Sequence, residues 1–149
     1  MKTVKHLLNE KGSQIWSTTP DATVHAALKI MAEKDVGALL VFSGGKLAGI
    51  FSERDYARKV ILYGKSSHDT LVKEIMTTTV TWVRPQQTVT ECMAIMTRKH
   101  IRHLPVFEGD HPVGMISIRD VVEAIIVEQA NALDRLERTA LGLEFEQPE

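Results

Sequence analysis

Apolar positions recur along the chain in two rhythms. Within residues 24–31, and again within residues 89–96, apolar side chains fall at i, i+3, i+4 and i+7, the spacing of one helix face. Each of these segments is followed by a short run rich in β-branched and aromatic residues, at 38–42 and 103–107, which indicates a strand. Turn residues and a second apolar run come next in both places, so the pattern predicts a β-hairpin after each helix.

The two patterns are copies of one unit. A shift of 65 positions places residues 20–55 over residues 85–120 without a gap, and 14 of these 36 positions are identical. A match of this kind indicates an internal duplication. Each copy is expected to contain a strand, a helix, two strands and a second helix, with Ser52 and Ser117 capping the second helices.

We expect an α+β fold in which two β-α-β-β-α motifs pack sheet to sheet about a pseudo-twofold axis, because one motif alone is too small to bury both faces of its sheet. The predicted parts are an N-terminal segment at 1–14, the first motif at 15–65, a linker with a short helix at 66–79, the second motif at 80–126, and a C-terminal helix and tail at 127–149. The helix that begins in the second motif continues as an apolar stripe, formed by Ile126, Ala130, Leu133, Leu136 and Ala140. Nothing in the repeat covers this stripe, and we expect it to join two copies as a homodimer.

Composition excludes several classes of protein. The 18 basic and 19 acidic residues leave a formal charge of -1, which favours neither nucleic acid nor an anionic membrane as a partner. The chain contains no apolar run of membrane-spanning length and no signal-peptide core near Met1, so we expect a cytoplasmic protein. Cys92 is the only cysteine and lies in a helical apolar stripe, which indicates a packing role. His100 and His103 have no third ligand at a suitable spacing, so no metal site is expected.

The sequence Ser-x-Arg-Asp occurs twice, at residues 52–55 and 117–120, where a predicted strand leads into a helix. One copy alone would be a structural capping box, because a serine and an acidic residue three positions later satisfy the first helical N–H groups. Two copies favour a ligand. The start of a helix attracts phosphate, the carboxylate can accept hydrogen bonds from both hydroxyls of a ribose, and arginine offers a forked donor to phosphate oxygens.

Residues 49–55 and 114–120, together with residues 101–106, resemble the tandem CBS motif, also called the Bateman module, over roughly residues 13–126. Residues 49–60 are similar to the small CBS-only proteins of bacteria and plant organelles. The resemblance implies that the chain reversibly binds an adenine nucleotide as a regulatory ligand, with AMP, ADP, ATP, NAD(H) and S-adenosylmethionine as the family's ligands, and that it carries no catalytic cofactor.

The resemblance also implies two clefts, each built from both copies. The first would contain Ser52, Arg54, Asp55, Thr78, Val80, Arg102 and His103. The second would contain Ser117, Arg119, Asp120, Ser13, Ile15, Gly37 and Ala38. In each cleft the aspartate would hold ribose hydroxyls, Val80 or Ile15 would flank adenine, and the serine and basic groups would meet phosphate.

The two implied clefts differ in charge. Arg102 and His103 contribute to the first cleft, whereas Gly37 and Ala38 occupy the matching positions of the second. We therefore expect the first cleft to favour the more highly charged phosphate, and the second to be weaker or to take a bulkier or less charged ligand.

The expected function is that of a sensor without catalytic activity. Ligand binding would change the angle between the motifs or the geometry of the dimer, and an unidentified protein partner would respond. Two alternatives stay open. A nucleotide hydrolase would need an acidic group near the phosphate, for which Glu53 is the candidate, with Ile118 at the matching position. A structural adaptor would have empty clefts, which the presence of both aspartates argues against.

Overall fold

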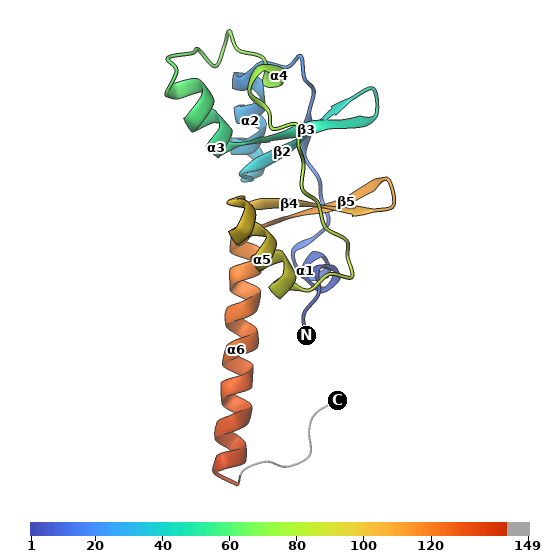
Figure 1. Cartoon of the computed structure of the whole chain (residues 1–149), viewed down its shortest axis with the longest axis vertical. Helices are drawn as coiled ribbons and strands as arrows, with labels where there is room; N and C mark the ends of the chain where they lie inside the picture. The colour runs from blue at the N-terminus through green and yellow to red at the C-terminus, as the bar shows by residue number, and fades with distance from the viewer. Residues whose placement is uncertain (143–149) are drawn as a thin grey trace.

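The computed structural model describes residues 1–142 and places the two predicted hairpins face to face at the middle of the molecule (Figure 1). The elements are α1 (Val4–Lys11), β1 (Ser17–Thr18), α2 (Val24–Lys34), β2 (Ala38–Ser43), β3 (Lys46–Ser52), α3 (Glu53–Tyr56), the π-helix η1 (Ala57–Ile61), α4 (Val72–Ile75), α5 (Val89–Lys99), β4 (His103–Glu108), β5 (His111–Ser117) and α6 (Ile118–Ala140). We call β1 to η1 the first unit, and α5 to α6 the second unit. The end of the predicted C-terminal tail, residues 143–149, lies outside the described residues.

The first helices of the two units begin and end alike. Thr23 and Thr88 are their N-caps, and each hydroxyl accepts a hydrogen bond from the backbone N–H three residues later. Both helices end at a non-glycine residue in the left-handed region, Asp35 and His100, each with a φ of 54°. The predicted duplication thus extends to the backbone conformation at single residues.

The sheets of the two units differ at one edge. Strands β2 and β3 pair antiparallel, as do β4 and β5, and each hairpin has an irregularity at the matching place in its first strand. In the first unit β1 adds a parallel strand beside β2. In the second unit the predicted first strand is reduced to one parallel bridge between Val83 and Val106.

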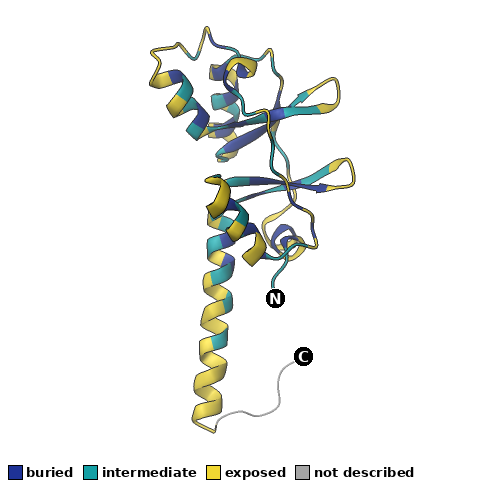
Figure 2. Cartoon of the chain, viewed as in Figure 1, coloured by how far each residue is buried: buried dark blue, intermediate teal, exposed yellow. Residues whose placement is uncertain are grey.

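The sheets are buried on both faces. Leu39, Val41 and Phe51 face α2 and belong to the core of the first unit. Leu40, which alternates with them along β2, is also fully buried. The second unit lies against that face of the sheet (Figures 1 and 2), which confirms the sheet-to-sheet packing.

The two short helices are exchanged between the units. α1 precedes the first unit in the chain, yet Val4, Leu7 and Leu8 belong to the core of the second. α4 precedes the second unit, and its Val72 and Ile75 lie in the core of the first. The N-terminal segment and the linker are therefore integral to the two cores.

The second helices of the units differ most. In the first unit a short α3 passes into the π-helix η1, whereas α6 runs for 23 residues. Among the residues of α6 only Val121 and Ala124 are buried. The rest of α6 extends away from the body, with Ile126, Leu133 and Leu136 exposed (Figure 2). Within residues 1–142 no helix combines the length and apolar character that a bilayer span requires.

Candidate ligand-binding site

The first Ser-x-Arg-Asp motif forms a capping box at the start of α3. The Ser52 N–H and hydroxyl donate to Asp55 Oδ2 over 3.0 and 3.1 Å, and the Asp55 N–H donates to Ser52 Oγ over 3.2 Å. Asp55 Oδ1 accepts from the Thr77 hydroxyl at 3.1 Å and lies 3.0 Å from Lys59 Nζ. Four donors therefore fill the roughly four lone-pair positions of this buried carboxylate.

The second motif repeats the capping box at the start of α6, but a different lysine approaches it. The Ser117 N–H donates to Asp120 Oδ2 over 2.8 Å. Lys11, in the last turn of α1, places its ammonium 2.7 Å from the same oxygen and donates to the Met115 carbonyl over 2.9 Å. This ion pair fixes the end of α1 to the start of α6.

The Asp120 carboxylate stays ionised in this setting. Burial alone would raise the pKa of Asp120, but the hydrogen bond and charge of Lys11, together with the hydrogen bonds from Ser117, outweigh burial and hold the pKa below its ordinary value. An ionised carboxylate is the form that accepts hydrogen bonds from a diol.

Sequence reasoning missed both lysines. Lys59 lies four residues after Asp55, which is the spacing of a helical ion pair. Its ammonium also donates to the Ile75 carbonyl over 3.1 Å, which ties η1 to α4. Lys11 carries no comparable signal, because it lies outside the repeat.

The two motif arginines point to different surroundings. Arg54 is half-buried, and its Nη1 donates to the His100 carbonyl, so the start of α3 contacts the second unit. Arg119 is exposed and pairs with Glu123 at 3.2 Å along its own helix. Of these two predicted phosphate donors, only Arg54 contacts the other unit.

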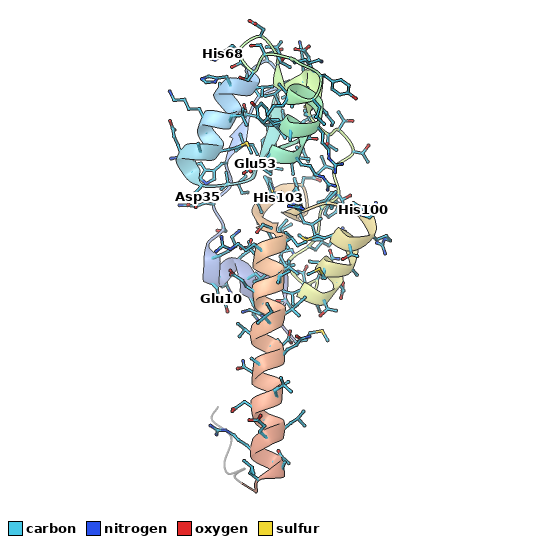
Figure 3. The ribbon with its side chains drawn as sticks, turned by 90° about the vertical axis from the view of Figure 1, so that its left-hand side faces the viewer. Glu10, Asp35, Glu53, His68, His100 and His103 are labelled. Carbon is cyan, nitrogen blue, oxygen red and sulfur yellow. The ribbon has the colours of Figure 1, made fainter. Side chains whose placement is uncertain are left out.

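His103 lies where the two units meet. Its Nε2 is 2.9 Å from the position that a Cβ on Gly37 would occupy, and Glu53 Oε1 is 3.3 Å from the same point. Figure 3 shows Glu53 and His103 close together between the units. The resemblance places His103 and Gly37 in different clefts, and in the structure the two residues lie next to each other.

Asp120 is the carboxylate that influences His103. Burial lowers the pKa of His103; the charge of Asp120 opposes this shift, while the charges of Lys11 and Arg102 add to it. The strand pairing agrees, since His103 lies opposite Ser117, and Ala38 lies opposite Ser52. Each strand start therefore adjoins the serine of its own repeat.

The remaining predicted site residues come shortly after Thr77 and Lys11 in the chain, two residues that bind Asp55 and Asp120, respectively. Thr78 and Val80 come directly after Thr77, whose hydroxyl binds Asp55. Ser13 and Ile15 come just after Lys11. Val80 and Ile15 are half-buried, whereas Thr78 and Ser13 are exposed.

An open hollow that was not predicted lies between α1 and α6. It has a volume of about 270 Å³, and Leu7, Lys11, Asp120 and Ala124 are among the residues that line it. A second hollow, of about 490 Å³, lies further along the same two helices, and Glu10 is among the residues that line it. The ion pair of Lys11 and Asp120 is thus accessible from the α1–α6 side.

Other reactive groups give no second site. Within the described part of the chain, no cluster of three or more His, Cys, Asp or Glu side chains could hold a metal ion. Burial, and to a lesser extent the charge of Glu91, raises the pKa of Cys92 to about 11. Its thiol is therefore protonated at neutral pH, as its buried position in the second core requires.

The chain is similar to known CBS domain-containing proteins. The mitochondrial CBS domain-containing protein CBSX3 of Arabidopsis thaliana is 45% identical over 130 residues, which cover 84% of this chain and 63% of that protein. The CBS domain-containing protein YhcV of Bacillus subtilis is 28% identical over 109 residues, covering 73% of this chain and 77% of YhcV. Because one relative is mitochondrial, a cytoplasmic location stays a prediction.

Solved structures and a family model lead to the same group. A protein with CBS domains from Burkholderia ambifaria MC40-6 is 49% identical with a TM-score of 0.82, and the match covers 86% of this chain and 96% of that one. A CBS-domain protein from Agrobacterium tumefaciens is 35% identical with a TM-score of 0.79, covering 83% and 98%. The CBS domain model matches residues 12–61 and 72–127, more than half of the chain. The chain belongs to the CBS-domain family and contains two tandem CBS domains.

Proposed function

We propose that this chain is a regulatory sensor of adenine nucleotides, with AMP, ADP, ATP or NAD(H) as the ligand, and that it catalyses no reaction. CBS-domain proteins generally act as regulatory modules that bind adenosine-containing ligands. The observation that carries the proposal is the paired arrangement of Asp55 and Asp120. Each carboxylate lies at the start of a helix, in a serine capping box and beside a lysine ammonium.

This arrangement suits both ends of a nucleotide. A ribose diol that displaces the present donors can hydrogen-bond to the ionised carboxylate, and the displaced ammonium offers charge to phosphate. Parts of both predicted sites lie at the contact between the units, since Arg54 bonds to the His100 carbonyl and His103 lies against Gly37. A ligand that prefers one arrangement of the units would favour that arrangement. An unidentified protein partner would respond to this change.

Titration calorimetry with AMP, ATP, NAD and NADH tests the proposal. We expect the wild type to bind at least one of them, and Asp55→Asn and Asp120→Asn each to weaken one site by about tenfold or more, because a neutral amide is a poorer acceptor for a diol. Asparagine keeps an acceptor in each capping box, so the variants should fold. Absence of heat with all four nucleotides would favour the structural adaptor.

The hydrolase alternative has its own observation. Glu53 lies near His103 at the contact of the units, so an acidic and an imidazole group approach one another there. Nucleotide turnover at stoichiometric protein, abolished by Glu53→Gln, would replace the sensor proposal with an enzyme.

We further propose that the exposed part of α6 pairs two copies of the chain. Leu133 is 62% and Leu136 is 66% exposed, on a stretch of helix that contacts no core. A lone helix of this kind is marginal in water, whereas pairing would bury its apolar stripe. In such a dimer, nucleotide binding to one copy would also affect the second copy.

Leu133→Asp is expected to dissociate this dimer. Burying one leucine contributes about 1.5–3 kcal/mol, and the twofold-related copy doubles the loss, so the dimer dissociation constant should rise by about a hundredfold or more. Sedimentation velocity measures the change. Asn131→Asp adds the same charge on the opposite side of α6 and should leave the assembly unchanged. A wild type that is monomeric at all concentrations, or an equal effect of both variants, would contradict the pairing.

A further inference from the structure

The Asp120 cleft contains a positive charge that the repeat does not encode. In the first unit the ammonium beside the aspartate comes from Lys59, four residues further along the same helix. The matching position after Asp120 is Ala124, so the second unit has no equivalent of that lysine. Lys11 supplies the charge instead, from a helix more than 100 residues away in the chain.

Asp120 is held less completely than Asp55. The hydrogen bonds to Asp120 from the Ser117 N–H and the Lys11 ammonium both end on Oδ2, whereas both oxygens of Asp55 accept. The Asp120 side chain is 20% exposed, against 11% for Asp55, and it lines an open hollow. A ribose at Asp120 would compete with Lys11 and Ser117. At Asp55 it would compete with Lys59 and Thr77 and with two bonds from Ser52.

A displaced Lys11 would leave excess positive charge around the ligand. Lys11 and Arg102 both lie close enough to His103 to act on its titration, and Asp120 is the carboxylate that acts on the same ring. If ribose hydroxyls engage Asp120, the ammonium of Lys11 loses its counter-ion. A phosphate group on the same ligand would replace that counter-ion, because phosphate is a strong acceptor for ammonium.

We infer that Lys11 selects phosphorylated ligands in the Asp120 cleft by exchanging the aspartate for the ligand's phosphate. The inference rests on the proposed function. A nucleoside without phosphate must displace the ammonium and leave it unpaired, whereas AMP provides a new partner. The expected difference between the clefts compared Arg102 and His103 with Gly37 and Ala38 and did not include Lys11.

Calorimetry with AMP and adenosine tests the exchange on the wild type, Lys11→Met and Lys59→Met. We expect the wild type to bind AMP more tightly than adenosine at one site. Lys11→Met should reduce this preference by about tenfold or more, through weaker AMP binding, tighter adenosine binding or both. Lys59→Met removes the matched ammonium from Asp55 and should leave the preference at the Asp120 site intact.

A rescue variant separates charge from folding. Lys11→Arg keeps the charge and should retain most of the preference for AMP, and thermal melts of all variants check that α1 stays in place. An unchanged preference in Lys11→Met, or an equal loss at the Asp120 site in Lys59→Met, would overturn the inference while leaving the proposed function standing. If neither ligand bound the wild type, the proposed function would fail and the inference with it.

Discussion

A chain that lacks residues 2–11 is expected to lose the ordered core of the second unit, although that unit begins some 80 residues later. The deletion removes Val4, Leu7 and Leu8, which are at most 8% exposed and pack among residues of α5, β4, β5 and α6. At about 1.5–3 kcal/mol for each buried side chain, the loss is about 5–9 kcal/mol, which approaches the whole stability of a typical domain.

Amide hydrogen exchange measures the loss of protection in each unit separately. Amides of β4 and β5 should lose most of their protection in the deleted chain, whereas amides of β2 and β3 should keep more of theirs, because the first unit is completed by α4. The double variant Lys5→Ala and Asn9→Ala alters only exposed residues of α1 and serves as the control. Equal loss of protection in both hairpins would mean that α1 supports the whole molecule and not one unit.

The periodicity of the sequence does not predict that α1 packs in the core of the second unit and α4 in the core of the first. The repeat predicted two equivalent helices, two hairpins and both serine caps, because each of these features depends on residues that are close together in sequence. A helix in the N-terminal segment was not predicted, and no local pattern says which of two similar cores its apolar residues Val4, Leu7 and Leu8 join. The backbone bond from the Val4 N–H to the Gln87 carbonyl, and its counterpart from Val72 to Ala22, join segments that the repeat frame does not relate.

The candidate site likewise contains residues that the sequence predicts and residues that it does not. Asp55 and Asp120 could be found from the sequence because the motif occurs twice, and their capping boxes follow from Ser52 and Ser117. Their lysine partners could not both be found. Lys59 has the helical spacing, although the π-helix around it was not predicted, while Lys11 reaches Asp120 only through tertiary packing. His103 shows the same limit, since its contact with Gly37 depends on how the sheets are stacked.

Gly49→Ala is expected to destabilise the chain by about 3 kcal/mol, well beyond the matched substitution Gly114→Ala at about 1 kcal/mol. Gly49 lies beside the end of α4 and Gly114 lies beside α1. A Cβ at either glycine would lie 2.6 Å from its nearest neighbouring atom. At Gly114 that neighbour is the tip of the Leu8 side chain, which can rotate away. At Gly49 it is the backbone carbonyl of Thr77, which accepts a 2.9 Å hydrogen bond from the Ile50 N–H, while the Thr77 N–H donates to the Ile50 carbonyl over 2.9 Å.

Gly49→Ala is also expected to disturb the candidate site around Asp55. A shift of Thr77 large enough to admit a methyl group would strain its two backbone bonds to Ile50 and withdraw its hydroxyl from Asp55. For a chain of this size, about 3 kcal/mol corresponds to a fall in Tm of about 6–12 °C, against about 2–4 °C for Gly114→Ala, measurable by calorimetry. Equal shifts for the two variants would mean that the Thr77 backbone yields as readily as a leucine side chain. The close fit between α4 and the first sheet would then contribute little to holding Asp55 in place.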